Sequence, residues 1–302
     1  MRPQYIVDIV KMVSKWAYYV IAAGSVLALI LGGIICYQIN YQDLKVIFFN
    51  VGQGDAILIS EGSHQVLIDG GRNGKVMLEK LGKFVPFWDR NIEAVIATHP
   101  DQDHIGGLVE VLAKYKVDFI LETNAKSDSA TYKAFEENIA KSGAEKIEAK
   151  KGIALKFPDG TTLAILHPFF EVPEASEYNS NDNSIVARLE LSNDSFLFTG
   201  DLLEKEELAL IGSKQNLSSN VLKVAHHGSK YSTSAEFLDA VKPAEAIISV
   251  GNNSYGHPAQ EVITRLSEHG VKIYRTDEIG DIIYECNPPP GGQNEKCKIG
   301  FK

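Results

Sequence analysis

Short apolar runs rich in β-branched residues recur along most of the chain, separated by stretches with helical periodicity. The runs predict strands at residues 44–50, 56–60, 65–68, 92–97, 119–122, 184–191, 195–201, 221–225, 246–250, 272–275 and 280–285, with shorter strands within 146–166. The helical stretches are residues 75–84, 107–115, 129–142, 202–210, 235–241 and 258–270. The strands form two groups, each interleaved with helices and followed by them. This order favours an α/β sandwich of two sheets packed face to face, with helices outside.

One stretch near the amino terminus departs from this pattern. No charged residue occurs from Trp16 to Gln42, and Ala17–Tyr37 is almost wholly apolar. That run is about as long as a helix needs to be to cross a bilayer. A cleaved signal peptide is the alternative, but the run is long for one and begins late. We therefore expect one uncleaved transmembrane helix.

Basic residues are distributed unequally around this stretch. Arg2, Lys11 and Lys15 precede it, whereas Lys45 is the only nearby basic residue after it. The positive-inside bias then places the amino terminus in the cytoplasm and the following domain outside the cell membrane. The expected organisation is a cytoplasmic end and anchor over residues 1–42, one globular domain over 43–287 and a polar tail over 288–302.

Charge and cysteine content narrow the choice of function. The net charge of −9 argues against broad, non-specific binding of nucleic acid through a basic face. It does not exclude a nuclease, because bound divalent cations change the charge of a site. Cys286 and Cys297 bracket a polar, Pro/Gly-rich stretch, and we hypothesise that they form a disulfide outside the cytoplasm. The alternative is two unrelated thiols near a frayed end.

The densest chemistry lies in the motif T-H-P-D-Q-D-H-I-G-G, residues 98–107. Its possible metal ligands are His99, Asp101, Asp103 and His104. They follow a predicted buried strand, and Gly106-Gly107 opens the next predicted helix, so we expect the ligands on a loop between two rigid elements. An acidic loop with incidental histidines is the alternative. Two imidazoles and two carboxylates within six residues favour the metal site.

Further candidates stand at the ends of other predicted strands. Asp201 follows Gly200 in F-T-G-D, and His226-His227 follows the strand at 221–225. Weaker candidates are Asp69 in I-D-G-G, Gln53 and Asp55 in V-G-Q-G-D-A, Ser229 after the histidine pair, and His257 in Y-G-H-P. Each of the weaker ones also fits a simple role in a turn. Ligands from several strand ends would converge at one edge of a sandwich.

These motifs, in this order, resemble the metallo-β-lactamase superfamily, and within it the extracytoplasmic domain of ComEC-type competence proteins. The resemblance rests on V-G-Q-G-D-A, L-I-D-G-G, T-H-P-D-Q-D-H-I-G-G-L, N-D-N-S-I-V, F-T-G-D, L-K-V-A-H-H-G-S and Y-G-H-P. It implies a four-layered αββα sandwich with one or two divalent metal ions at its edge. ComEC proteins also carry a large multi-helix channel, whereas this chain has one apparent span.

The resemblance also implies a role for each candidate. His99 and Asp101 would bind a first metal ion, and Asp103, His104 and either His226 or His227 a second. Asp201 would bridge the two, and Asp69 would support the ligand loop through hydrogen bonds. The histidine of the pair that is not a ligand could contact a phosphate oxygen. Independently of the resemblance, Gln53 and Asp55, in their glycine-rich loop, and Ser229 are weaker candidates to line the substrate cleft.

Asp101 replaces a histidine of the superfamily's H-x-H-x-D-H signature, and no histidine precedes Asp201 where most relatives have one. Oxygen ligands favour harder ions, so manganese competes with zinc, and the first metal site could be weak or empty. The implied reaction is attack by a metal-activated water near Asp103. His257 would protonate the leaving oxygen or hold a phosphate.

The sequence thus predicts a membrane-anchored metal-dependent hydrolase that cleaves phosphodiester bonds, with DNA as the expected substrate and no nucleotide cofactor. One alternative is a hydrolase of a cell-envelope phosphodiester or small ester. Another is a non-catalytic module that the metal stabilises for binding. The oligomeric state is left open.

Overall fold

The computed structural model describes residues 4–40, 44–170, 172, 179–191, 193–286 and 296–302. Contacts divide the chain into two compact units, Met1–Gln42 and Asp43–Lys302. In the first unit the described residues form one helix, α1 (Gln4–Asn40). Within it, Lys15–Gly33 is long and apolar enough to cross a membrane, with a mean hydropathy of 1.7.

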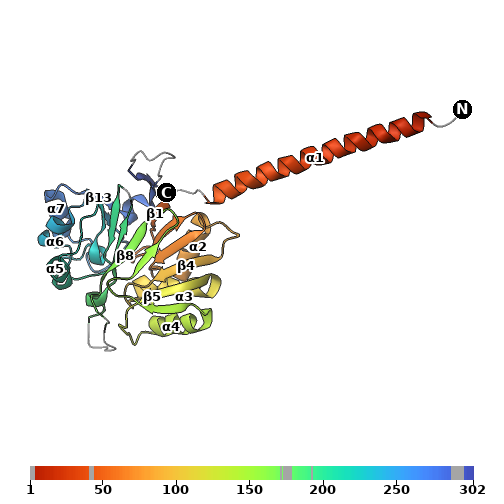
Figure 1. Cartoon of the computed structure of the whole chain (residues 1–302). Helices are drawn as coiled ribbons and strands as arrows, with labels where there is room; N and C mark the ends of the chain where they lie inside the picture. Colours follow the sequence, from red (N-terminus) through yellow and green to blue (C-terminus); the bar gives the residue numbers. More distant parts are fainter. Residues whose placement is uncertain (1–3, 41–43, 171, 173–178, 192, 287–295) are drawn as a thin grey trace. The chain divides into compact units, whose positions relative to one another are not determined.

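Two mixed sheets form the second unit (Figure 1). The first sheet has the order β15 (Lys298–Phe301), β14 (Ile282–Cys286), β1 (Leu44–Phe48), β2 (Ile57–Glu61), β3 (His64–Ile68), β4 (Asn91–Ile96), β5 (Lys116–Glu122) and β6 (Glu145–Glu148). The second sheet has the order β13 (Lys272–Arg275), β12 (Glu245–Ile248), β11 (Val221–Lys223), β10 (Ser195–Phe198), β9 (Val186–Glu190), β8 (Thr162–His167) and β7 (Ala154–Lys156).

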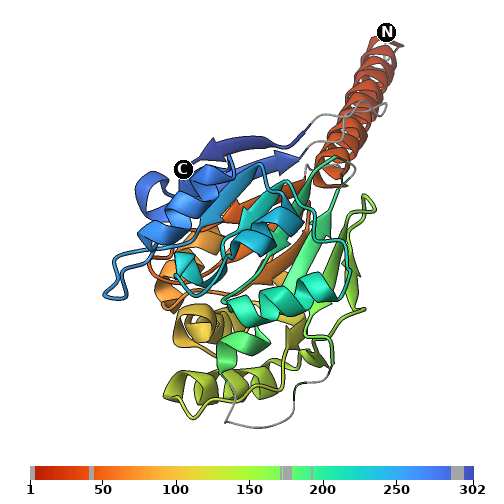
Figure 2. The ribbon, with the colours of Figure 1, turned by 90° about the vertical axis from the view of Figure 1, so that its left-hand side faces the viewer.

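Helices cover the outer face of each sheet (Figures 1 and 2). The first sheet carries α2 (Gly74–Phe84), α3 (Gln102–Lys114) and α4 (Ala130–Ser142), and the second carries α5 (Glu204–Gly212), α6 (Ala235–Val241) and α7 (Gln260–Glu268). The remaining short turns of helix are α8 (Thr276–Ile279) and the 3₁₀ turns η1 (Ser180–Asn183) and η2 (Ala225–Gly228). The predicted αββα sandwich is confirmed.

Alternation along the strands explains why there are three apolar layers. On β1, Val46 and Phe48 point between the two sheets, whereas Ile47 points toward the helices on the outer face. The ring of Phe48 meets that of Phe198, from β10 of the second sheet, with centroids 6.1 Å apart. Because both faces of each sheet are buried, the strands are nearly continuous apolar runs, and this is the pattern that made them recognisable.

The carboxyl-terminal boundary differs from the prediction. The predicted polar tail, 288–302, falls partly outside the described residues, but its end forms β15, which pairs with β14 in antiparallel register. A disulfide joins Cys286 to Cys297, as hypothesised. The first sheet therefore extends past residue 287, and the crosslink holds its last strand. Neither α8 nor β15 was predicted from the sequence.

Candidate metal centre

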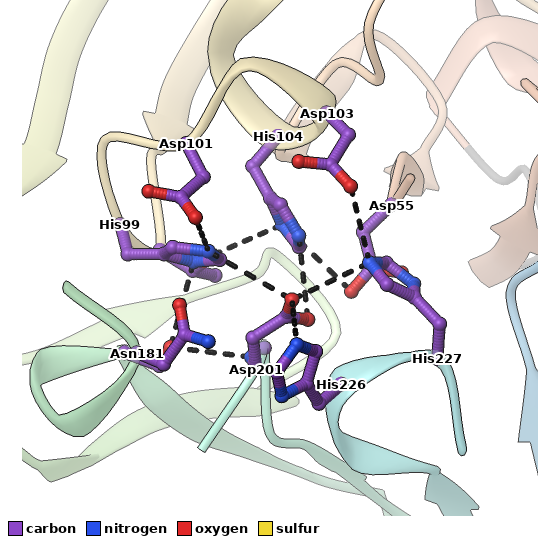
Figure 3. A network of polar contacts seen from close by, with 12 residues as sticks. Asp55, His99, Asp101, Asp103, His104, Asn181, Asp201, His226 and His227 are labelled. Atoms are coloured by element: carbon purple, nitrogen blue, oxygen red, sulfur yellow. Dashed lines mark hydrogen bonds and ion pairs between the residues drawn. The ribbon is translucent and has the colours of Figure 1, made fainter. Parts of the chain in front are cut away.

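The sheets bring the candidate ligands to one edge of the sandwich. Asp69 and His99 follow β3 and β4 of the first sheet, while Asp201 and the histidine pair follow β10 and β11 of the second. All four strands point the same way, toward this edge, where their carboxyl ends meet. Figure 3 shows the side chains converging from both sheets. The predicted convergence is present in the structure.

The motif at 98–107 differs from the predicted loop in one respect. Helix α3 begins at Gln102, five residues earlier than expected, so Asp103 and His104 lie in its first turn and Asp101 is its N-cap. Gly106 and Gly107 are therefore inside the helix. A Cβ on Gly107 would collide with the carbonyl oxygen of Gly70. These glycines allow α3 to pack closely on the turn after β3, and they do not start a helix.

We call Asp103, His104 and His227 the second side of the metal centre. This side is largely buried. Nε2 of His227 lies 3.6 Å from Oδ2 of Asp103 and 3.4 Å from Oδ2 of Asp201. Nε2 of His104 lies 3.3 Å from Oδ1 of Asp201. One ligand atom from each member of the second side lies within 4.8 Å of the others, a spacing that one metal ion could bridge.

The first side of the centre consists of His99 and Asp101. Nε2 of His99 lies 3.8 Å from Oδ2 of Asp101 and 3.9 Å from Oδ2 of Asp201. The Asp101 side chain is 44% exposed, and it accepts a 2.8 Å hydrogen bond from Oγ of Ser180 in η1. His99, His104 and Asp201 also form a compact group of possible ligands. Asp201 therefore contacts both sides, which is the geometry that the predicted bridging role requires.

The buried donor atoms fit a divalent metal ion. Among the described residues, Nε2 of His99, His104 and His227 and Oδ1 of Asp201 are buried without a hydrogen-bond partner. Buried polar atoms are almost always paired, so these four atoms, which gather around Asp201, fit the ligands of a divalent cation. Nitrogen and carboxylate oxygen suit zinc and also manganese.

The other ring nitrogens are held by the protein. Nδ1 of His104 lies 2.8 Å from Oδ2 of Asp69, and Nδ1 of His227 lies 2.9 Å from the Ser249 carbonyl oxygen. Asp69 also accepts hydrogen bonds from the backbone N–H of Thr98 at 2.8 Å and from its hydroxyl at 2.7 Å. These contacts present Nε2 to the centre. They agree with the supporting role predicted for Asp69.

The electrostatics of the two sides differ. Burial lowers the pKa of His104 and of His227, but Asp201, together with further neighbouring carboxylates, outweighs burial and holds both well above the usual value. Burial also lowers the pKa of His99, and the adjacent His104 lowers it further. Burial raises the pKa of Asp201, yet His227 and His104 keep it well below its usual range. The metal-free second side thus carries protons at neutral pH.

Geometry separates the two adjacent histidines, which the sequence left open. Both have left-handed backbone conformations, with φ of 52° for His226 and 54° for His227, so their side chains diverge. His227 is buried against Asp103 and Asp201. His226 reaches only Asp201, with Nε2 3.8 Å from Oδ2, and it belongs to no compact ligand group among the described residues. The geometry therefore favours His227 over His226 as a metal ligand.

His226 instead begins a row of rings that leads out of the centre. Its ring centroid lies 5.4 Å from that of His257, which lies 5.8 Å from that of the exposed Tyr255. Backbone N–H and C=O groups of His257 are both bonded to the Asn253 side chain. Burial lowers the pKa of His257, and His226 lowers it further. Its position fits the predicted contact with a substrate oxygen.

Two of the weaker candidates, Asp55 and Ser229, are more deeply buried than a cleft position requires. Asp55 is 1% exposed and lies beneath the centre, with Oδ1 3.4 Å from Nδ1 of His227. Ser229 is buried, and its hydroxyl accepts a hydrogen bond from the backbone N–H of Tyr231. Gln53 accepts a hydrogen bond from the Gly251 N–H. Asp55 and Ser229 do not line an open cleft, because their side chains serve internal contacts.

Lys223 was missed by the sequence analysis. It is fully buried in β11 and forms an ion pair with Asp55, below His227. Burial raises the pKa of Asp55, but Lys223 and then His227 outweigh burial and lower it. The available signal was a single lysine inside the apolar run before His226-His227, since a charged residue there must have a buried partner.

The fold and this centre together define a metal-dependent hydrolase. Residues 49–252 match the Metallo-beta-lactamase superfamily. The chain belongs to that superfamily, whose members bind divalent metals at such clusters of histidine and aspartate. Within it, this chain is related to ComEC-type competence proteins.

The curated relatives are considerably longer than this chain. "ComE operon protein 3" of Bacillus subtilis (strain 168) is 33% identical, with 85% of this chain and 36% of the relative covered. "Competence protein ComA" of Neisseria gonorrhoeae is 29% identical, with 85% and 35% covered. This chain thus spans about a third of their length.

Among solved structures, the metallo-beta-lactamase fold protein YhfI from Bacillus subtilis matches 86% of this chain and all of its own, with a TM-score of 0.52 and 13% identity. That similarity supports the fold.

Proposed function

We propose that the protein is a membrane-anchored phosphodiesterase that cleaves DNA outside the cytoplasmic membrane. The observation that carries the proposal is the set of four buried, unpartnered donor atoms on His99, His104, His227 and Asp201. A purely structural zinc site is closed and usually richer in cysteine. This centre contains only imidazole and carboxylate, and it opens to solvent beside Asp101. Those features favour catalysis over a non-catalytic binding module.

The residues around the centre would have different roles in the reaction. His99, His104, His227, Asp103 and Asp201 would hold one or two divalent ions, which supply Lewis acidity and an acidified water. Asp103 is 19% exposed and stands where the second side meets solvent, so its free oxygen could orient the attacking water. His257 lies next to His226, where it could donate a proton to a leaving oxygen.

The surface beside the centre is suited to a single strand. Tyr255 is 68% exposed and Tyr231 is 63% exposed, and both follow strands that end at the metal edge. Exposed rings stack on nucleobases without regard to sequence. The Lys230 ammonium, which lies over the Tyr231 ring, could contact a phosphate. The named competence proteins among the relatives add support for DNA as the substrate.

Membrane anchoring is supported by Lys15–Gly33 and by the kinship with competence proteins. We infer that α1 crosses the bilayer with its amino terminus in the cytoplasm. Arg2, Lys11 and Lys15 then lie on the inner side, and the Cys286–Cys297 disulfide lies in an oxidising compartment.

A smaller substrate is the second candidate. The net charge of −9 makes a long polyanion costly to approach. A phosphodiester or small ester of the cell envelope would avoid that cost, because only the reacting group would enter the centre.

The test uses the full chain in detergent with manganese or zinc. The substrates are single-stranded DNA, duplex DNA and bis(p-nitrophenyl) phosphate. We expect metal-dependent cleavage, fastest on single strands. Asp103→Asn should abolish it, while Asp239→Asn, at an exposed position, should not. Cleavage of the small diester alone would select the second candidate, and no turnover with either metal would contradict hydrolysis.

A further inference from the structure

The ion pair of Lys223 and Asp55 connects the two sheets beneath the metal centre. Lys223 lies on β11 and Asp55 in the connection between β1 and β2, and each is 1% exposed. Val221, two residues before Lys223, belongs to the apolar layer between the sheets. Because side chains alternate along a strand, Lys223 points into the same layer. Its ammonium group therefore reaches from the second sheet to a carboxylate of the first.

Stability alone does not account for this pair. The attraction between a buried lysine and a buried aspartate is offset by the hydration that both lose, so two apolar side chains of similar size would stabilise a core equally well. The surroundings of the pair suggest another role. Each member contacts a segment of the chain that carries candidate metal ligands, as the following contacts show.

The two carboxylate oxygens of Asp55 face different partners. Oδ2 pairs with Lys223, while Oδ1 lies 3.4 Å from Nδ1 of His227 (Figure 3). The same Nδ1 lies 2.9 Å from the carbonyl oxygen of Ser249. A carboxylate behind the Nδ1–H of a histidine orients the ring and makes Nε2 a stronger metal ligand. Lys223 thus holds one oxygen of Asp55, which leaves the other turned toward His227.

Backbone contacts connect the pair to two further ligands. The backbone N–H of Asp55 donates a 3.1 Å hydrogen bond to the carbonyl oxygen of Asp103. The Lys223 ammonium donates a 3.4 Å hydrogen bond to the carbonyl oxygen of Gly200, the residue before Asp201. Asp103 comes from the first sheet and Asp201 from the second. The pair is therefore in contact with ligand segments on both sides of the sandwich.

We propose that Lys223 and Asp55 are positioning residues for the second side of the centre. The ion pair orients the ring of His227 and sets the spacing between the ligands that the two sheets contribute. This inference rests on the metal binding of the proposed function and not on its substrate. Asp55 also has an oxygen within 4.8 Å of possible ligand atoms on Asp201 and His227. Because Lys223 already neutralises this carboxylate, Asp55 supports the ligands and is not one of them.

Removing both charges together tests the proposal. Lys223→Met/Asp55→Asn preserves the net charge and the approximate size of both side chains, so the fold should be retained. The control, Arg188→Met/Glu190→Gln, also removes an ion pair, with Nη1 and Oε2 2.9 Å apart, at the end of β9 away from the centre. Both variants are made in the full chain in detergent.

Three measurements are compared among the variants and the unmodified chain: zinc affinity by competition with a chromophoric chelator, visible absorption of bound cobalt(II), and thermal unfolding without metal. In the Lys223/Asp55 variant, zinc affinity at the tighter site should fall by about 10–100-fold, and the cobalt absorption should change. Its melting temperature without metal should change no more than that of the control. The control should keep the affinity and absorption of the unmodified chain.

Each result decides the proposal. Unchanged affinity and absorption in the Lys223/Asp55 variant would overturn the positioning role and leave the hydrolase in place. Loss of one whole equivalent of metal would make Asp55 a ligand and also contradict the proposal. A variant that is unfolded without metal would assign the pair to the fold alone. An unmodified chain that binds neither zinc nor cobalt would refute the metal centre, and with it both the proposed function and this inference.

Discussion

The two sides of the metal centre share Asp201 but are built differently. On the second side, His104 and His227 are buried, and each holds its Nδ1 against an oxygen of the protein. On the first side, His99 is paired with a carboxylate, Asp101, that is 44% exposed and already bonded to Ser180. Preorganised imidazoles favour tight binding, whereas a solvated carboxylate favours harder, more labile ions. The second side should hold its metal ion more tightly.

The largest effect is expected where the two sides meet. Asp201→Ala should remove metal from both sides, because its two oxygens face His104 on one hand and His99 and His227 on the other. Activity should fall by about 10²–10³-fold or more. Metal content per chain, measured by mass spectrometry, should fall with it. Asp239→Ala, on the surface, is the control, and retention of metal by Asp201→Ala would refute the bridging role.

Substituting each of the adjacent histidines tests the second side alone. His227→Ala should lose one metal ion and about 10²-fold in activity, because it removes a buried ligand. His226→Ala should keep its metal content and lose about tenfold at most, since it removes a contact beside the substrate. Isothermal titration and steady-state kinetics on both variants measure the difference. Equal metal loss in the two variants would contradict the assignment of His227.

The pH dependence of binding should also distinguish the sides. The pKa values of His104 and His227 are held above the usual value, so a metal ion entering the second side must displace protons. Affinity there should rise by up to about tenfold per pH unit for each proton displaced, and so by up to about a hundredfold per unit between pH 6 and 8 if both imidazoles lose one. The pKa of His99 is lowered, so it is already neutral and adds little to this slope. Calorimetry in buffers of different ionisation enthalpy counts the protons released, and a pH-independent affinity would contradict this account.

The smallest effect should come from enriching the first side. Asp101→His replaces an exposed carboxylate with an imidazole, and zinc affinity at the weaker site should rise by about tenfold at most. The variant should bind manganese at this side less favourably, relative to zinc, than the unmodified protein does. Competition between the two metals, followed by metal analysis, measures the change. A variant whose preference is unchanged would show that Asp101 does not set the metal at this side.

Chemistry-bearing residues were easier to predict than their geometry. His99, Asp103, His104 and Asp201 could be found because imidazole and carboxylate groups gathered at the ends of buried strands contribute little to the packing of a core. The choice of His227 over His226 could not be predicted, since it depends on two left-handed backbone conformations and not on residue type. The fold followed from continuous apolar runs separated by stretches with helical periodicity.

Packing decided the features that were missed. The start of α3 was misplaced because its glycines permit close approach to Gly70, which has no local signal. The ion pair of Lys223 and Asp55 joins residues far apart in the sequence. Strand β15 depends on a partner strand and a crosslink more than on its own four residues.

The centre draws its donors from both sheets, with His99 and His104 on one and Asp201 and His227 on the other. A bound metal ion therefore acts as a noncovalent clamp between the halves of the sandwich. By mass action, the free energy of unfolding increases with free metal concentration. Without a bound metal ion, the buried carboxylates of the centre would repel one another or bind protons. Resistance to proteases should then increase with the supply of metal ions. Chains that reach their compartment without a bound metal ion would be the first to be degraded.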